Sequence, residues 1–156
     1  MRLVDERPPM SMTMQDSKLG RIGTLCVLYF SQGVPWAFIT VAFVAVLVEN
    51  DAIVDDQVAA LTLAGTLPWM FGKLVLGPLI DRVRFPTYGL RRPWIIIAQL
   101  GMIVTMAFFL TLDDPLADGN LETGLPTIML FFLIHNVFAT LQDVSSDALA
   151  VDLIPE

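Results

Sequence analysis

The sequence predicts an all-α membrane protein with four transmembrane helices. Hydrophobic residues make up 55% of the 156 residues and charged residues only 16%, whereas charged residues form about a quarter of an ordinary soluble domain. Four apolar segments reach the length of about 20 residues that a helix needs to cross a hydrocarbon core. The charged residues gather in the short connections between these segments. Together these observations favour helices embedded in a lipid bilayer.

The predicted spans are residues 22–48, 58–80, 93–112 and 126–153. The apolar part of the fourth span ends near Leu141, and its helical pattern continues through polar residues to about Leu153. Residues 1–21 are rich in polar and charged side chains, which predicts a disordered cytoplasmic leader. Residues 22–156 are expected to form the transmembrane region.

Basic and acidic residues alternate between the connections. Lys and Arg occur before the first span and between the second and third, where the last of them is Arg92. The connections at 49–57 and 113–122 carry Asp and Glu but no Lys or Arg. The positive-inside rule then places the N-terminus and the arginine-containing loop in the cytoplasm. We therefore expect a multi-pass protein of the cell's inner (plasma) membrane, with the lipid bilayer as its immediate partner.

Several other classes are disfavoured by the same composition. A soluble four-helix bundle needs a polar face on each helix, whereas residues 25–30 and 41–48 are apolar all round. Basic residues end at Arg92, so no nucleic-acid surface is expected. The lone Cys26 excludes an internal disulfide. No nucleophile–base pair or metal-ligand set is visible, so we expect neither an enzyme nor a cofactor or metal site.

The fourth span carries polar residues that are costly in lipid. Asn136, Thr140, Asp143 and Asp147 share one helical face at about 100° per residue. Carboxylates in a span are tolerated when they face protein or water, so this face should point inward. Mutual repulsion between Asp143 and Asp147 favours binding of a proton at one of them. The alternative is structural pairing of Asp147 with Arg82 or Arg84, and Asp152, on the opposite side of the helix, is expected to be solvated.

Three further polar sites each have two interpretations. His135 either relays protons or donates a single hydrogen bond to a neighbouring helix. Lys73 either extends toward the cytoplasmic interface, or faces a cavity where it attracts an anion or pairs with an aspartate of the fourth span. Gln32 and Trp36 share a face of the first span, next to Pro35, which is expected to kink the helix. This face suits either a substrate path or helix packing.

The loop between the second and third spans carries a recognisable motif. The run Gly77-x-Leu79-Ile80-Asp81-Arg82, followed by Arg91-Arg92-Pro93-Trp94, resembles the loop motif of major facilitator transporters. This loop is longer than the commonest form of the motif. The longer loop and the pattern Gln142-Asp143-x-x-x-Asp147 resemble those of AmpG-type muropeptide permeases and acetyl-CoA transporters, one branch of these transporters. The resemblance implies that the chain is the first part of a major facilitator N-terminal six-helix bundle.

The resemblance also implies a function. The expected activity is proton-coupled uptake of a solute, muropeptide-like or another anionic metabolite, by a secondary active transporter. The substrate and proton path would be lined by Gln32, Trp36, Lys73, His135, Asn136, Asp143 and Asp147. The cytoplasmic loop motif, acting as a gate latch, would comprise Gly77, Asp81, Arg82, Arg91 and Arg92.

The number of spans raises an alternative function. Such transporters are built from two six-helix halves with nested three-helix repeats, so four helices complete one repeat and begin a second. The expected partners are therefore the remaining transporter helices in cis, or a partner chain. The alternative is a truncated or split membrane subunit that packs with a partner and does not transport by itself.

Overall fold

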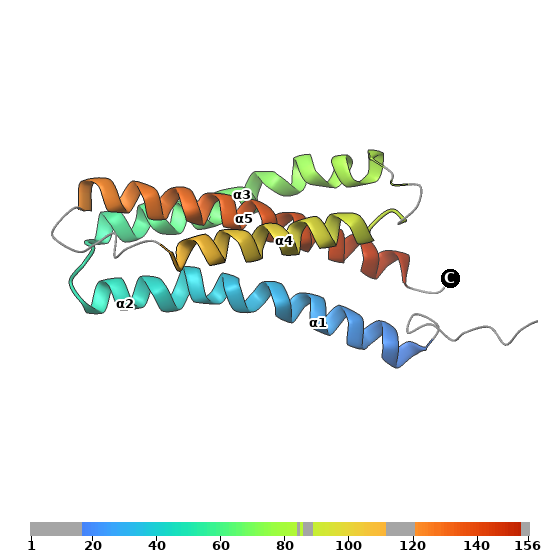
Figure 1. Cartoon of the computed structure of the whole chain (residues 1–156). Coiled ribbons are helices and arrows are strands. Elements are labelled where there is room, and N and C mark those ends of the chain that lie inside the picture. Colours follow the sequence, from blue (N-terminus) through green and yellow to red (C-terminus); the bar gives the residue numbers. More distant parts are fainter. Residues whose placement is uncertain (1–16, 84, 86–88, 112–120, 154–156) are drawn as a thin grey trace, which may run out of the picture.

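The computed structural model describes residues 17–83, 85, 89–111 and 121–153, which form a bundle of long helices without a strand in these ranges (Figure 1). The first long helix runs through α1 (Lys18–Ala37), the π-helical segment η2 (Phe38–Phe43) and α2 (Val44–Glu49). The others are α3 (Asp55–Arg82), α4 (Arg92–Phe109) and α5 (Leu121–Asp152). All four are long and apolar enough to cross a membrane. The predicted all-α membrane class is confirmed.

The helix ends differ from the predicted spans by a few residues. The first helix begins at Lys18, because the side chain of Ser17 caps it by accepting the backbone N–H of Gly20 at 2.9 Å. Residues 18–21 therefore belong to α1, and the predicted disorder of residues 1–16 lies outside the described residues. The second helix begins at Asp55, where the side-chain oxygen of Gln57 accepts the backbone N–H of Val54 at 3.0 Å.

Pro35 lies inside α1 and does not end it. Proline has no N–H, so the helical hydrogen-bond ladder is interrupted there. The chain continues as α-helix to Ala37 and then widens into η2. Local π-helical stretches are a known way for a helix to absorb such an interruption. A π-helical segment thus follows the proline that was expected to kink the helix.

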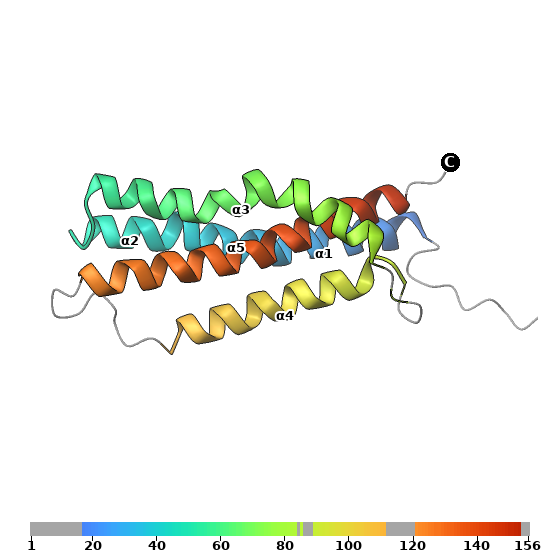
Figure 2. The ribbon, with the colours of Figure 1, turned by 90° about the horizontal axis from the view of Figure 1, so that it is seen from above.

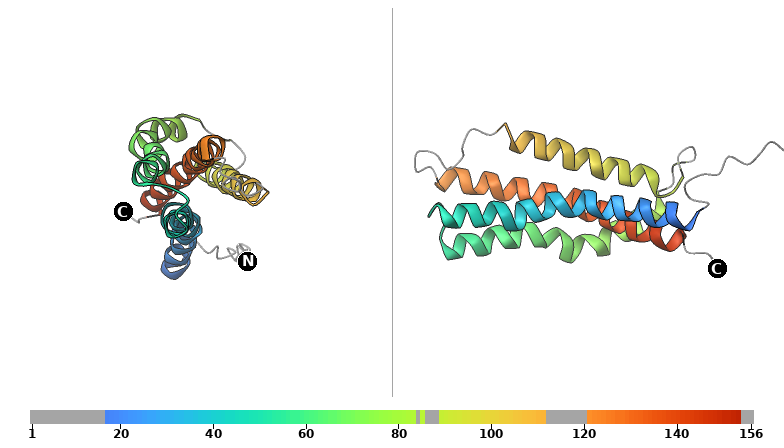
Figure 3. Two further views of the ribbon diagram at one scale, coloured as in Figure 1. Left: turned by 90° about the vertical axis from the view of Figure 1, so that its left-hand side faces the viewer. Right: turned by 90° about the horizontal axis from the view of Figure 1, so that it is seen from below.

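Helix α5 is the centre of the bundle. It packs against α1, α3 and α4, and the end-on view in Figure 3 shows these three helices arranged around it. Figure 2 shows α3 and α4 on opposite sides of α5. Polar side chains on the inward-facing sides of α5 can therefore meet a neighbouring helix rather than lipid.

Glycines allow two of these helices to approach α5 closely. A Cβ at Gly101 of α4 would lie 2.3 Å from the ring of Phe138 on α5. A Cβ at Gly72 of α3 would lie 2.9 Å from Cγ2 of Thr140, also on α5. Small residues at helix contacts are the usual means of close packing in membranes, where no hydrophobic force drives helices together.

The distribution of side chains is the reverse of that in a soluble protein. Large apolar side chains such as Phe30, Leu74 and Ile103 are exposed on the outer surface of the bundle. Polar side chains are buried inside it, mostly on α5: Gln32, Thr105, His135, Asn136, Thr140, Gln142, Asp143, Ser145 and Ser146. The fold thus gathers its hydrogen-bonding groups in the interior.

Candidate functional site

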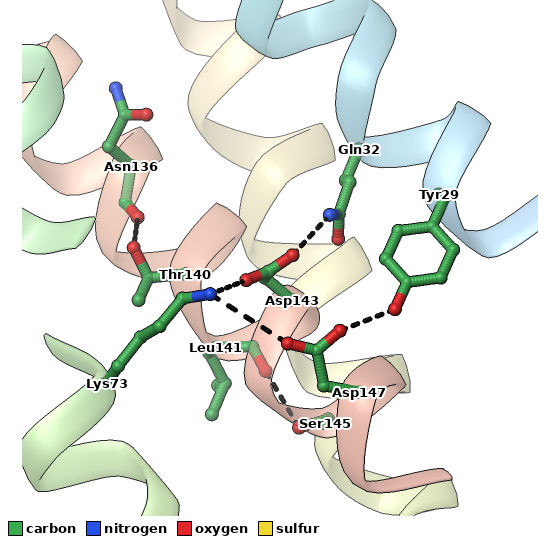
Figure 4. Close-up of polar contacts among 9 residues, drawn as sticks. All are labelled: Tyr29, Gln32, Lys73, Asn136, Thr140, Leu141, Asp143, Ser145 and Asp147. Atoms are coloured by element: carbon green, nitrogen blue, oxygen red, sulfur yellow. Dashed lines mark hydrogen bonds and ion pairs between the residues drawn. The ribbon is translucent and has the colours of Figure 1, made fainter. Parts of the chain in front are cut away.

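The centre of the candidate site is the carboxylate of Asp143, which α5 places between α1 and α3 (Figure 4). The residue is only 4% exposed. Its Oδ2 lies 2.6 Å from Nζ of Lys73, and its Oδ1 accepts a hydrogen bond of 2.8 Å from Nε2 of Gln32. A buried carboxylate is tolerated when a cation and hydrogen-bond donors compensate it. Of the two interpretations of Lys73, the structure shows the pairing with an aspartate.

Asp147 lies one turn further along α5 and extends this cluster to the surface. The side chain is 52% exposed, and its Oδ2 lies 3.8 Å from the Lys73 ammonium. Its Oδ1 accepts a hydrogen bond from the hydroxyl of Tyr29 on α1. Asp147 therefore pairs with Lys73 rather than with Arg82, while the alternative partner Arg84 lies outside the described residues. One ammonium thus faces two carboxylates, so the ion cluster carries a surplus negative charge when both are ionised.

A cavity of about 300 Å³ adjoins this cluster. It is lined by Gln32, Gly33, Trp36, Thr66, Trp69 and Ala139, which come from α1, α3 and α5. The ammonium of Lys73 lies 4.7 Å from the centroid of the Trp69 ring, within cation–π distance. Both predicted α1 residues, Gln32 and Trp36, therefore meet the cavity. Lys73 thus contacts Trp69, one of the residues that line the cavity.

A second hydrogen-bond network fixes α1 against α5. Nε2 of Gln142 donates to the carbonyl oxygen of Leu28 at 3.0 Å and to Oγ of Ser31 at 2.9 Å. Gln99 of α4 approaches the same Ser31 Oγ at 3.5 Å. This network sets the distance between the helices that carry Gln32 and Asp143.

The remaining predicted α5 residues lie apart from the ion cluster. Nδ1 of His135 is 2.9 Å from Oγ1 of Thr105, so this ring faces α4 and makes the single interhelical bond that was one of its two interpretations. Asn136 is fully buried and donates to the carbonyl oxygen of Phe132 at 2.8 Å. A Cβ on Gly65 of α3 would lie 3.8 Å from the Asn136 amide nitrogen. Asn136 therefore shares the face of Asp143 but sits in a packed contact with α3.

The cytoplasmic loop motif forms a separate ion cluster. Nη1 of Arg91 lies 2.5 Å from Oδ1 of Asp81, and Nε of Arg91 lies 3.1 Å from Oδ2 of Asp152. The arginine thus ties the end of α3 to the end of α5. Although burial opposes its charge, the hydrogen bonds that Arg91 donates to Asp81 and Asp152 raise the pKa of Arg91 above its usual value.

Asp152 is 47% exposed, but it also has an ion-pair partner that the sequence interpretation did not include. It was expected to be solvated because it lies opposite Asp143 and Asp147 on the helical wheel. That opposite side of α5 faces the start of α4, where Arg91 is located. The loop arginine consequently meets Asp152, and not the two aspartates of the central cluster. Of the other motif residues, Arg82 and Arg92 are exposed, and a Cβ on Gly77 would meet nothing within 4 Å.

Sequence reasoning missed Tyr29 and Trp69. Neither residue was among the expected site residues. A signal for each was present, since Tyr29 lies three residues before Gln32 and Trp69 four residues before Lys73, which are helix-neighbour spacings. Within the described ranges, no group of three His, Cys, Asp or Glu side chains is placed to hold a metal ion.

A bundle of membrane-length helices with a compensated charge cluster in its interior defines an integral membrane protein of the kind that carries ions or solutes. Residues 21–156 match the family described as Acetyl-coenzyme A transporter 1, and the chain belongs to this family. Membership makes it a membrane transporter protein and supports the expectation that it is not an enzyme. No solved structure matches the chain.

Proposed function

We propose that the chain forms the first helices of a proton-coupled secondary transporter of the major facilitator type, which takes up an anionic metabolite. The family name supports acetyl-coenzyme A as the cargo, and a muropeptide-like solute is the second candidate. The observation that carries the proposal is the ion cluster in which Lys73 faces Asp143 and Asp147. Within the part of the chain that the structure describes, this cluster is where a buried carboxylate, Asp143, lies beside an exposed one, Asp147.

The cluster provides a direct way to couple a proton to an anion. With both aspartates ionised, Lys73 is held by Asp143, and the positive charge of Lys73 is fully compensated. When a proton neutralises one aspartate, the attraction on the ammonium weakens and Lys73 becomes available to an anionic group of the substrate. Proton binding and anion binding then favour each other, which is the requirement for symport.

The arginine bridge gives the loop motif a role in gating. Asp81, Arg91 and Asp152 connect three helix ends on what the charge distribution indicates is the cytoplasmic side. Movement of α5 during transport would have to break or reform this bridge. We propose that the bridge holds one conformation of the transporter, and that the protein lies in the cell's inner membrane with its N-terminus in the cytoplasm.

Uptake into proteoliposomes tests the proposed function. The protein, in its full encoded length, would be reconstituted with labelled acetyl-coenzyme A outside and an imposed pH gradient, acid outside. The expected result is accumulation that a protonophore abolishes, with no accumulation of a neutral solute. Uptake that is indifferent to the pH gradient would contradict proton coupling. If the protein transports only together with another purified membrane chain, the alternative of a packing subunit is supported.

A further inference from the structure

The cavity between α1, α3 and α5 carries hydrogen-bonding groups that the ion cluster does not use. Nε1 of Trp69 and Oε1 of Gln32 are buried and have no hydrogen-bond partner among the described residues. Both residues line the cavity. Buried indole N–H and amide groups normally find a partner, because an unpaired polar group in the interior is costly. A donor and an acceptor therefore border the same space.

The orientation of the Gln32 amide is fixed by its neighbour. The carboxylate of Asp143 only accepts hydrogen bonds, so it must face the NH₂ group of Gln32, at 2.8 Å. The carbonyl end, Oε1, is thereby turned away from Asp143 and remains an acceptor. Gln32 itself is only 7% exposed. The ion cluster thus orients this buried acceptor, which does not belong to a freely rotating surface side chain.

The cavity walls restrict the shape of an occupant. Trp36 and Trp69 contribute indole surfaces, and Lys73 places a cation against the Trp69 ring at 4.7 Å. Indole surfaces favour flat groups, because stacking maximises contact. A group that satisfies the unpartnered atoms must also offer an acceptor to Trp69 and a donor to Gln32. A secondary amide, which carries its C=O and N–H on opposite sides, and the edge of an aminopurine both supply one acceptor and one donor.

We propose that this cavity is a substrate subsite that binds a flat, neutral amide-like edge of the cargo, while Lys73 holds an anionic group of the same molecule. The Trp69 indole N–H donates to the carbonyl or ring nitrogen of this edge, and Gln32 Oε1 accepts its N–H. The inference rests on the proposed function for the identity of the cargo. Acetyl-coenzyme A contains both edges, amides in its pantetheine arm and an aminopurine in its nucleotide arm.

Binding measurements with the two arms separately test the subsite. Detergent-purified protein in its full encoded length would be titrated with acetyl-coenzyme A, 4′-phosphopantetheine and adenosine 3′,5′-bisphosphate. Trp69→Phe keeps a ring and removes the N–H, and the expected result is about a tenfold loss of affinity for acetyl-coenzyme A and for the arm that occupies the subsite. The arm that loses affinity identifies which edge is bound.

Matched controls separate the subsite from general damage. Trp94 also has a buried, unpartnered indole nitrogen, but it packs against Phe85, with ring centroids 5.7 Å apart, so Trp94→Phe should leave binding unchanged. A Cβ at Gly33 or at Gly23 would meet nothing within 4 Å. Gly33 lines the cavity, whereas Gly23 does not. Gly33→Leu should therefore weaken binding, whereas Gly23→Leu should not.

The outcomes distinguish the subsite from the proposed function. If Trp69→Phe and Gly33→Leu bind both arms as tightly as the unmodified protein, or if neither arm binds, the subsite is excluded. If the arms bind and Trp69→Phe weakens one of them, the subsite is supported even when proteoliposomes show no proton-driven uptake. In that case the transport proposal fails alone.

Discussion

At the residue scale, Lys73 and Asp143 each offset the free-energy cost of placing the other's charge in a low-dielectric interior. The carboxylate is buried, and its ion pair with the ammonium measures 2.6 Å. The lysine side chain is 43% exposed, so the pair is partly open to a competing anion or to water. An ion pair of this kind is stable as a unit, and loss of either charge alone leaves the other uncompensated.

The first prediction concerns this mutual dependence. Lys73→Met leaves a buried charged carboxylate without its cation, so we expect the protein to lose about 1–3 kcal/mol of stability. Lys73→Met combined with Asp143→Asn should recover most of that loss, because both charges are then absent. Unfolding in detergent measures both, with Lys18→Met at the exposed start of α1 as the control. A double variant as unstable as Lys73→Met would contradict the pairing.

The sequence alone predicted the face of α5 but not its contacts. A helical wheel places Asn136, Asp143 and Asp147 together, and in the structure Asp143 and Asp147 share one cation. The wheel contains no information on the angles at which α1 and α3 cross α5. For that reason the contacts of Tyr29 and Trp69 could not be predicted, and the two interpretations of Lys73 could not be separated.

At the element scale, the position of each helix depends on a few contacts with α5. Helix ends were predicted within a few residues, because apolar length and the nearest charges determine them. The π-helical segment and the close approach at Gly101 were not predictable, since both depend on which neighbour packs against the helix. Interhelical distance in membranes is decided by such small-residue contacts.

The second prediction tests the contact between α4 and α5. Gly101→Val should destabilise the bundle by about 1–3 kcal/mol, because its Cβ would lie 2.3 Å from the Phe138 ring. Gly23→Val, where a Cβ meets nothing within 4 Å, should leave the unfolding temperature nearly unchanged. Adding Phe138→Ala to Gly101→Val should restore part of the loss. Equal stability of the Gly101→Val and Gly23→Val variants would contradict the close packing.

The third prediction concerns the bridge between helix ends. Arg91→Gln removes the cation shared by Asp81 and Asp152, so the ends of α3 and α5 should exchange their amide hydrogens faster. The cost in global stability should be only about 0.5–1 kcal/mol, because both carboxylates are largely exposed. Arg92→Gln, at an exposed neighbouring position, is the matched control. Unchanged exchange at residues 79–82 and 149–152 would argue against the bridge.

At the scale of the whole molecule, the distribution of charge predicts the orientation of the bundle. The connection between α2 and α3 is acidic, and the connection between α3 and α4 is basic. The class of the fold followed from composition and apolar length, which do not depend on the details of packing. Orientation follows from the positive-inside rule and can be measured independently of transport.

The fourth prediction tests this orientation by cysteine labelling. In a Cys26→Ser background, Asp51→Cys should react in intact cells with a membrane-impermeant maleimide. Gly89→Cys should react only after the membrane is made permeable, because its loop is expected to be cytoplasmic. The reverse pattern would invert the topology, and with it the side on which the Asp81–Arg91–Asp152 bridge lies.

The most direct test of the account is proton-driven uptake by Asp143→Asn in the full encoded protein. This change removes the charge that holds Lys73 while keeping the size of the side chain, so membrane insertion should be preserved. In this variant, accumulation of labelled acetyl-coenzyme A in response to an acid-outside pH gradient should be abolished. Undiminished pH-driven accumulation by Asp143→Asn would contradict the assignment of the Lys73–Asp143–Asp147 cluster as the coupling site.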